Sequence, residues 1–207
     1  MNKEQTITGV IRGTGACVPE RILDNDEIAG FVDTSDEWIR ERTGVRKRRI
    51  AEKETTVSMA CEAGRQAVEE AGISPGEIDM ILVATGSPDQ IFPCTACRVQ
   101  EALGADGAVG FDLNAACSGF LFAYNTAQAY IASGIYRTVL VIGSESISRM
   151  VDWTDRGTCI LFGDGAGAVL LQAAEGKTYR PAAHSDGSGG PALTGPGVRN
   201  RIRSIDK

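Results

Sequence analysis

Short, wholly apolar runs alternate along this chain with longer segments in which apolar residues recur at helical spacing. Residues 80–85 and 138–143 are two such runs, long enough for a strand and too short for an ordinary helix. A strand without polar alternation is buried on both faces, which is typical of a sheet covered by helices on either side. The alternation therefore predicts an α/β fold with a layered sheet.

The remaining segments extend this pattern. We expect strands at residues 7–18 and 108–113 and a last strand, broken by glycines, within 159–171. Helices are predicted over 55–71, 93–103 and 118–133, the first ending at Gly72 and the second beginning with Pro93. Strand and helix in this order predict a mostly parallel, five-stranded sheet with helices on both faces.

Charge and composition exclude several classes of protein. With 21 Lys and Arg against 27 Asp and Glu, the net charge is −6, which argues against a general nucleic-acid binder. The first residues contain no apolar signal segment, and no later run approaches the ~18 apolar residues of a membrane span. We therefore expect a cytoplasmic protein without membrane contact.

Six scattered cysteines in such a chain are expected to be reduced thiols. Cys94 and Cys97 form one CxxC motif, which is consistent with a redox motif, half of a zinc site, or two small residues on one helix face. With His184 as the single histidine and no second CxxC, a four-ligand zinc site is difficult to assemble, and no metal is predicted. The third interpretation is favoured.

Two glycine patterns were tested against dinucleotide binding. The segment 13–15 follows a strand but leads to Pro19, and the segment 163–167 leads into a strand-like apolar run. Neither has the strand, loop and helix that hold a pyrophosphate. We interpret both as packing and turn positions.

Cys117 has the sequence context of a nucleophile. An apolar strand ends just before it, small residues form a tight turn, and a long apolar helix begins at the cysteine. The positive end of a helix favours a thiolate, and the Cys117 N–H can donate to a developing oxyanion. The residues alone leave open the alternative of a buried cysteine at a helix start.

The segment 114–120, Asn-Ala-Ala-Cys-Ser-Gly-Phe, resembles the nucleophile motif of β-ketoacyl-acyl-carrier-protein synthase III, a condensing enzyme of the thiolase superfamily. Residues 34–39, 42–44, 155–158 and 162–168 also match motifs of this family, and the resemblance runs from about residue 6 to residue 190. It implies the N-terminal half of a duplicated thiolase-like fold. Residues 1–175 would form that half, and residues 176–207 would begin the connection to a second half that this chain lacks.

The resemblance also implies a reaction. Acyl-coenzyme A acylates Cys117, and decarboxylative condensation with malonyl-acyl-carrier protein then gives a 3-oxoacyl-carrier protein, initiating fatty-acid synthesis. Coenzyme A enters as part of the substrate, and no separate cofactor is implied. The resemblance also implies a homodimer.

Particular residues match binding positions of the family. Trp38 matches the residue that stacks on adenine, Arg42 and Arg156 match residues near the nucleotide and its phosphates, and Thr34 matches a further contact in the channel. Phe92 matches a family position that lines the primer pocket from across a dimer interface, and Phe162 is assigned to the same pocket. Seven basic residues between positions 40 and 53 add a surface suited to a polyanion or an acidic carrier protein.

The sequence departs from the family at one point. The condensation step depends on a histidine and an asparagine of the C-terminal half, and no residue here matches either one; His184 matches a loop. Two alternatives stay open: a catalytically incomplete half that binds acyl-coenzyme A or a partner subunit, and a polyketide-type condensing enzyme. Residues 1–207 alone are expected to expose a large apolar face, to fold poorly, and to make no ketoacyl product.

Overall fold

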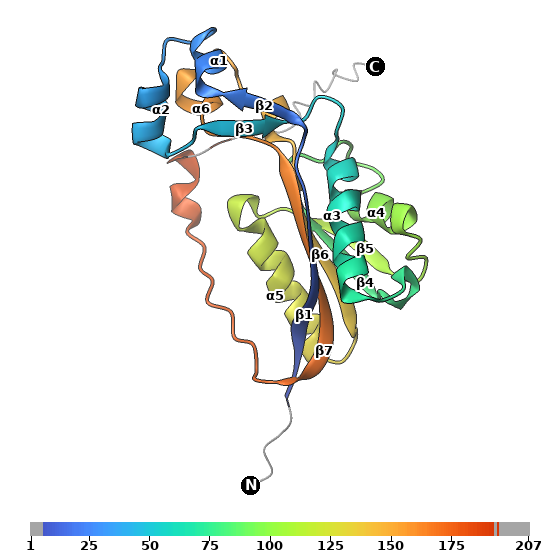
Figure 1. The fold of residues 1–207 in the computed structure, drawn as a ribbon. Coiled ribbons are helices and arrows are strands. Elements are labelled where there is room, and N and C mark those ends of the chain that lie inside the picture. Colours follow the sequence, from blue (N-terminus) through green and yellow to red (C-terminus); the bar gives the residue numbers. More distant parts are fainter. Residues whose placement is uncertain (1–5, 193, 195–207) are drawn as a thin grey trace, which may run out of the picture.

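The computed structural model describes residues 6–192 and 194. Its centre is a five-stranded sheet in the order β1-β7-β6-β4-β5 (Figure 1). The strands are β1 (Thr6–Cys17), β4 (Met80–Ala84), β5 (Val109–Leu113), β6 (Thr138–Glu145) and β7 (Gly165–Gly176). The β4 strand pairs in parallel with β5 and β6, whereas β7 is antiparallel to both β1 and β6. Four strands therefore point in one direction, and β7 alone makes the sheet mixed.

Helices cover both faces of this sheet, as predicted. The helices α3 (Thr56–Ala71) and α4 (Thr95–Leu103) lie on one face, and α5 (Gly119–Ala132) lies on the other (Figure 1). All five residues of β4 are buried, with Ile81 and Val83 in the core beneath α3 and α4 and with Met80 and Leu82 in the core beneath α5. Alternate side chains of one strand thus build two cores.

The helix ends follow local chemistry. Thr55 caps α3 in a reciprocal capping box with Ser58, and Gly72 ends this helix in a left-handed conformation (φ 68°), as expected. The α4 helix begins at Thr95 instead of Pro93, because the Asp112 carboxylate accepts hydrogen bonds from the first N–H groups of that helix at 2.8 Å. No helix in the described part of the chain is long and apolar enough to cross a membrane.

A smaller unit packs at one end of the sheet. The two-stranded antiparallel sheet of β2 (Arg21–Asp24) and β3 (Lys47–Ile50) meets the short helices α1 (Asn25–Ala29), α2 (Asp36–Thr43) and α6 (Arg156–Cys159) around a third core. Short 3₁₀ turns complete the chain: η1 (Pro75–Glu77), η2 (Ala116–Ser118), η3 (Ile147–Arg149) and η4 (Gly187–Ala192). The last strand, predicted within 159–171, begins at Gly165 and runs on to Gly176, while Cys159 belongs to α6 and to this third core.

Two buried charged side chains attach the smaller unit to the sheet. Asp164, which precedes β7, accepts hydrogen bonds from the Ala51 N–H (2.7 Å) and from the N–H and hydroxyl of Ser148 (2.9 and 2.5 Å). Arg48, 5% exposed, donates to the Leu23 and Ile160 carbonyls and to the Asn25 side chain. Burial lowers the pKa of Arg48. Arg48 therefore does not contribute to the basic surface that we expected over residues 40–53.

The chain after β7 runs back beside α5 (Figure 1). Tyr179 donates a hydrogen bond to Asn125 (2.6 Å) and packs edge-on against Tyr124. The apolar face of α5 is partly covered in this way, although Leu121 stays 61% exposed. The predicted connection over 176–207 begins where β7 ends, and residues 193 and 195–207 lie outside the described residues. The domain division stays a prediction.

A first prediction concerns the contact between β1 and α3. A Cβ atom placed on Gly13 would lie 2.1 Å from the Ala67 carbonyl oxygen, so we expect Gly13→Ala to force the helix off the strand. Overpacking of this kind costs about 1–3 kcal/mol of unfolding free energy. Gly107→Ala is the control, because no atom lies within 4 Å of its Cβ position. Urea unfolding that gives both variants the same stability would contradict the prediction.

Candidate active site

The turn between β5 and α5 presents Cys117 at the surface. The Asn114 side chain accepts a hydrogen bond from the Ala116 N–H (3.1 Å), and Ala116 has a positive φ of 46°. Cys117 follows in the middle of the 3₁₀ turn η2, with its side chain exposed. The sequence placed the start of the helix at the cysteine, but α5 begins two residues later because the chain completes this tighter turn first. The alternative of a buried cysteine is wrong.

The geometry of this turn suits nucleophilic chemistry. A non-glycine residue at positive φ costs roughly 1 kcal/mol, and such conformations cluster at turns that aim a reactive side chain. Ser118, the residue that precedes α5, gives no side-chain hydrogen bond to the helix. The positive end of α5, two residues after Cys117, is therefore left without a side-chain cap, which is a suitable environment for an anion.

Trp38, Arg42 and Arg156 come together although they lie on two separate helices. The Arg42 guanidinium carbon lies 4.1 Å from the centre of the Trp38 ring, and that of Arg156 lies 4.8 Å away. Arg156 also donates to the Asp33 carbonyl (2.9 Å) and lies 3.9 Å from its carboxylate. Both contacts with the ring fall within the range of a cation–π interaction. Two cations and one aromatic surface therefore form a single cluster.

Thr34 lies in the segment between α1 and α2, next to Asp33. Its hydroxyl oxygen is buried and has no hydrogen-bond partner among the described residues. An unsatisfied buried hydroxyl costs free energy unless a ligand or water supplies the missing hydrogen bond. This oxygen is therefore a candidate contact for a ligand held at the Trp38 cluster.

The sheet topology places this cluster and Cys117 at the same end of the molecule. Cys117 follows the carboxyl end of β5, and the smaller unit is formed by chain that follows the carboxyl ends of β1 and β6. These three strands point in the same direction. Ligands in open α/β sheets bind at the carboxyl ends of the strands.

The two candidate pocket phenylalanines are not brought together by a recorded contact. Phe92 is 87% exposed on the loop before α4, whereas Phe162 is half-buried between α6 and β7. Their assignment to a primer pocket stays a prediction.

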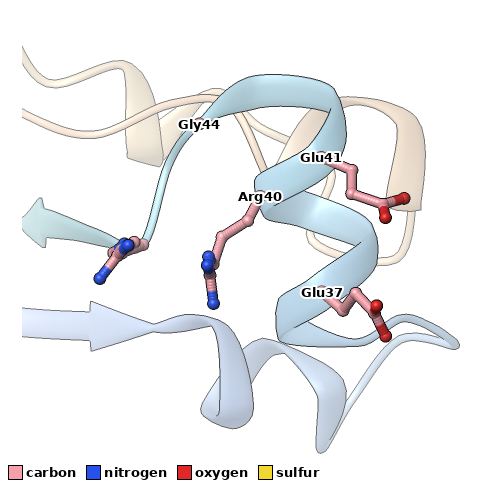
Figure 2. A pocket seen from close by; sticks show the side chains of 5 residues that line it. Glu37, Arg40, Glu41 and Gly44 are labelled. Atoms are coloured by element: carbon pink, nitrogen blue, oxygen red, sulfur yellow. The ribbon is translucent and has the colours of Figure 1, made fainter.

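A separate hollow of about 550 Å³ lies beside α2 (Figure 2). It is lined by Glu37, Arg40, Glu41, Gly44 and Arg46. Figure 2 shows the Arg40 side chain on one side of the helix and the Glu37 and Glu41 carboxylates on another. Neither Cys117 nor any of the candidate nucleotide-binding residues lines this hollow, so the hollow is separate from the candidate active site.

Two aspartates hold the site in place, and sequence reasoning missed Asp33 but identified Asp155 as a residue that orients Arg156 or turns the chain. Asp33 anchors Arg156, and Asp155 turns the chain by accepting hydrogen bonds from Gly157 N–H (2.8 Å) and Thr158 hydroxyl (2.7 Å). The Asp-x-Gly-Thr pattern at 155–158 is a helix-capping signal that the sequence does contain. No comparable signal marks Asp33, because its contact crosses 123 positions of the chain.

The other thiols are held in less reactive surroundings. Burial raises the pKa of Cys17, Cys61 and Cys159, and a hydrogen bond shared with Cys94, together with partial burial, raises that of Cys97. Within the described residues, no group of three or more His, Cys, Asp or Glu side chains is arranged to hold a metal ion.

Comparisons with known proteins give a consistent result. Residues 111–187 match the family described as 3-oxoacyl-[acyl-carrier-protein (ACP)] synthase III. Beta-ketoacyl-[acyl-carrier-protein] synthase III of Erythrobacter litoralis is 50% identical over 202 residues, 91% of this chain and 63% of that protein. The crystal structure of 3-oxoacyl-[acyl-carrier-protein] synthase III from Aquifex aeolicus is 51% identical, with a TM-score of 0.80 over 82% of this chain and 55% of that one.

A third match is the priming β-ketosynthase from the R1128 polyketide biosynthetic pathway, 39% identical with a TM-score of 0.79 over 84% of this chain and 52% of that one. The chain therefore spans between 52% and 63% of the length of these three relatives. The thiolase-like fold that the resemblance implied is confirmed.

We predict that Cys117 is the fastest-alkylating of the six thiols, because it is exposed at the start of a helix while Cys17, Cys61 and Cys159 are shielded. Brief iodoacetamide treatment followed by peptide mapping measures the order of labelling. Labelling of Cys61 or Cys159 before Cys117 would contradict the prediction. Cys97, which is also exposed, is the thiol whose alkylation rate is most important to compare with that of Cys117.

Proposed function

The chain belongs to the 3-oxoacyl-[acyl-carrier-protein] synthase III family, and on this premise we propose that Cys117 accepts the acyl group of an acyl-coenzyme A. The observation that carries the proposal is the exposed Cys117 on a positive-φ turn, at the same end of the sheet as the Trp38 cluster. A nucleophile and a binding surface for a flat, anionic nucleotide are the two parts that such a transfer needs.

The acyl transfer follows from these groups. The Cys117 thiolate attacks the thioester carbonyl, the tetrahedral oxyanion lies near the uncapped start of α5, and coenzyme A leaves as its thiol. Trp38 supplies the stacking surface for adenine, and Arg42 and Arg156 supply charge for the phosphates. Thr34 offers a hydroxyl with an unused hydrogen bond.

The condensation step is proposed for the whole protein of which these residues form a part. In that step malonyl-acyl-carrier protein loses carbon dioxide and its carbanion attacks the acyl group on Cys117, which initiates fatty-acid synthesis. His184, the one histidine of the sequence, lies with Ser118 in the lining of a hollow beside α5, and the proposal gives it no role in this step. The reaction requires no resident cofactor.

We propose further that the protein is a cytoplasmic homodimer. The exposed side chains of Ile91 (63%) and Phe92 (87%) on one loop support a contact between two copies, since large apolar side chains side by side on a surface are typical of interfaces. A dimer in which Phe92 enters the primer pocket of its partner is the arrangement that the family resemblance implies.

Mass spectrometry of the intact protein after incubation with acetyl-coenzyme A tests the proposed function directly. We expect one acetyl group, located on Cys117 by peptide mapping and lost in Cys117→Ser. Binding of acetyl-coenzyme A without acetylation of the wild-type chain would instead support the catalytically incomplete alternative.

We predict that Arg156→Ala and Arg42→Ala slow acetylation by acetyl-coenzyme A much more than acetylation by a short acetyl thioester without the nucleotide. A charge-assisted phosphate contact is worth about 1.5–3 kcal/mol, which is one to two decades in affinity. Trp38→Ala is expected to behave likewise through lost stacking. Arg40→Ala is the control, because Arg40 lies on the same helix as Arg42 and pairs with Asp36. Equal losses with both thioesters would indicate damage to the fold.

A further inference from the structure

The CxxC motif at the start of α4 is a pair of neighbouring sulfurs outside the proposed acyl-transfer site. The Cys94 and Cys97 sulfur atoms lie 3.4 Å apart, and the Cys94 thiol is in position to donate a hydrogen bond to Cys97. Both cysteines are reduced, Cys97 is exposed, and Cys94 is half-buried behind it. This separation is a non-bonded contact, so a small change in side-chain torsions brings the two sulfurs within bonding distance.

The backbone at the start of α4 fixes the positions of Cys94 and Cys97 relative to each other. Cys94 is the residue that precedes α4 and has extended backbone angles (φ −66°, ψ 159°), whereas Cys97 lies in the first turn of the helix. The Asp112 carboxylate fixes the two residues between them by accepting hydrogen bonds from the Thr95 and Ala96 N–H groups, both at 2.8 Å. The two sulfurs therefore face one another from a rigid turn, and closing a bond between them does not require the helix to unwind.

We propose that Cys94 and Cys97 form a redox-active dithiol that closes reversibly to a disulfide, independently of Cys117. This goes beyond the acyl-transfer function and uses none of its residues. It also revises the interpretation of the motif as two small residues on one helix face, since the sequence alone did not show that the sulfurs touch.

The closing reaction is a thiol–disulfide exchange with a low-molecular-weight disulfide. One cysteine thiolate attacks the S–S bond of the oxidant, forms a mixed disulfide and releases one small thiol; the second cysteine then attacks the mixed disulfide and releases the other small thiol. One S–S bond breaks and one forms, the two cysteines are oxidised by two electrons, and their two protons end on the two released thiols. A small dithiol reverses the reaction.

The exposed position of Cys97 makes it the sulfur that meets the oxidant, and Cys94 is placed to resolve the mixed disulfide. The hydrogen bond that Cys97 shares with Cys94, together with partial burial, favours the protonated thiol and raises the pKa of Cys97, so the exchange is best measured in mildly alkaline solution. Once the mixed disulfide forms, the second step is intramolecular and is favoured by the proximity of the two sulfurs.

Oxidised glutathione tests the proposal on the full chain. Trypsin cuts after Arg65 and Arg98, so the peptide 66–98 contains Cys94 and Cys97 and no other cysteine. After oxidation and alkylation, we expect wild-type peptide that is lighter by two hydrogen atoms and unalkylated, outnumbering its glutathione adduct by about tenfold. Dithiothreitol should restore double alkylation.

Two single substitutions give the matched controls. In Cys94→Ser the remaining Cys97 should accumulate as the glutathione adduct, because nothing resolves it, and Cys97→Ser leaves only the half-buried Cys94. Cys94→Ser is expected to fold, since Cys94 gives α4 no side-chain cap and serine is a preferred residue at that position. Cys117→Ser should close the 94–97 disulfide as readily as wild type.

Three results would overturn the proposal. The first is a stable glutathione adduct on Cys97 in the wild-type chain while Cys94 is still alkylated. The second is a peptide 66–98 that stays doubly alkylated under conditions that oxidise Cys117. The third is a disulfide that links either cysteine to another part of the chain. None of these results bears on acetylation of Cys117, so the two proposals fail separately.

Discussion

Burial of the central strands on both faces is the constraint on which the candidate site depends. The β4 and β6 strands carry side chains into two cores, with Leu140 and Ile142 facing α3 and with Val139 and Val141 facing α5. Each such side chain contributes about 1.5–3 kcal/mol when fully buried. A strand held from both sides cannot slide or twist freely, so the turns at its carboxyl end start from fixed positions. The turn that presents Cys117 follows β5, which is paired in register with β4.

The smaller unit, which contains Trp38, is held by two buried charged side chains, Asp164 and Arg48, that do not pair with each other. Asp164 accepts hydrogen bonds from the Ala51 and Ser148 donors. Arg48 donates through its two terminal nitrogens to two carbonyls and the Asn25 side chain, while its buried Nε has no partner among the described residues. Buried charges of this kind are tolerated because hydrogen bonds replace the lost hydration, and removal of one partner leaves an unsatisfied group. The smaller unit, with Trp38, is thereby attached to the sheet through directional contacts rather than through a continuous core.

Much of the main sheet was predictable because its signals are local. Apolar runs mark β4 and β6, and Thr55 with Ser58 and Gly72 marks both ends of α3. The antiparallel direction of β7 was not predictable, since it depends on the path of the segment between β6 and β7. That segment has no strong hydrophobic periodicity. The two-stranded sheet of β2 and β3 was not predicted for a similar reason: each strand has four residues, of which two in β2 and three in β3 are charged. Within the site, the motif residues were identified by resemblance, whereas the partners that position them, Asp33 and Arg48, act across long stretches of chain.

The stacking of two guanidinium groups on Trp38 has a consequence for the selectivity of this surface. A guanidinium is flat and of aromatic thickness, so the arginines already occupy part of the space that a heteroaromatic ring would take. A base that takes the place of one of them breaks a cation–π contact worth about 0.5–1 kcal/mol at an exposed site. A neutral aromatic compound gains little from such an exchange. A ligand that also carries phosphates gives the displaced guanidinium a new anionic partner, so we expect the cluster to favour molecules that join a base to a polyanion.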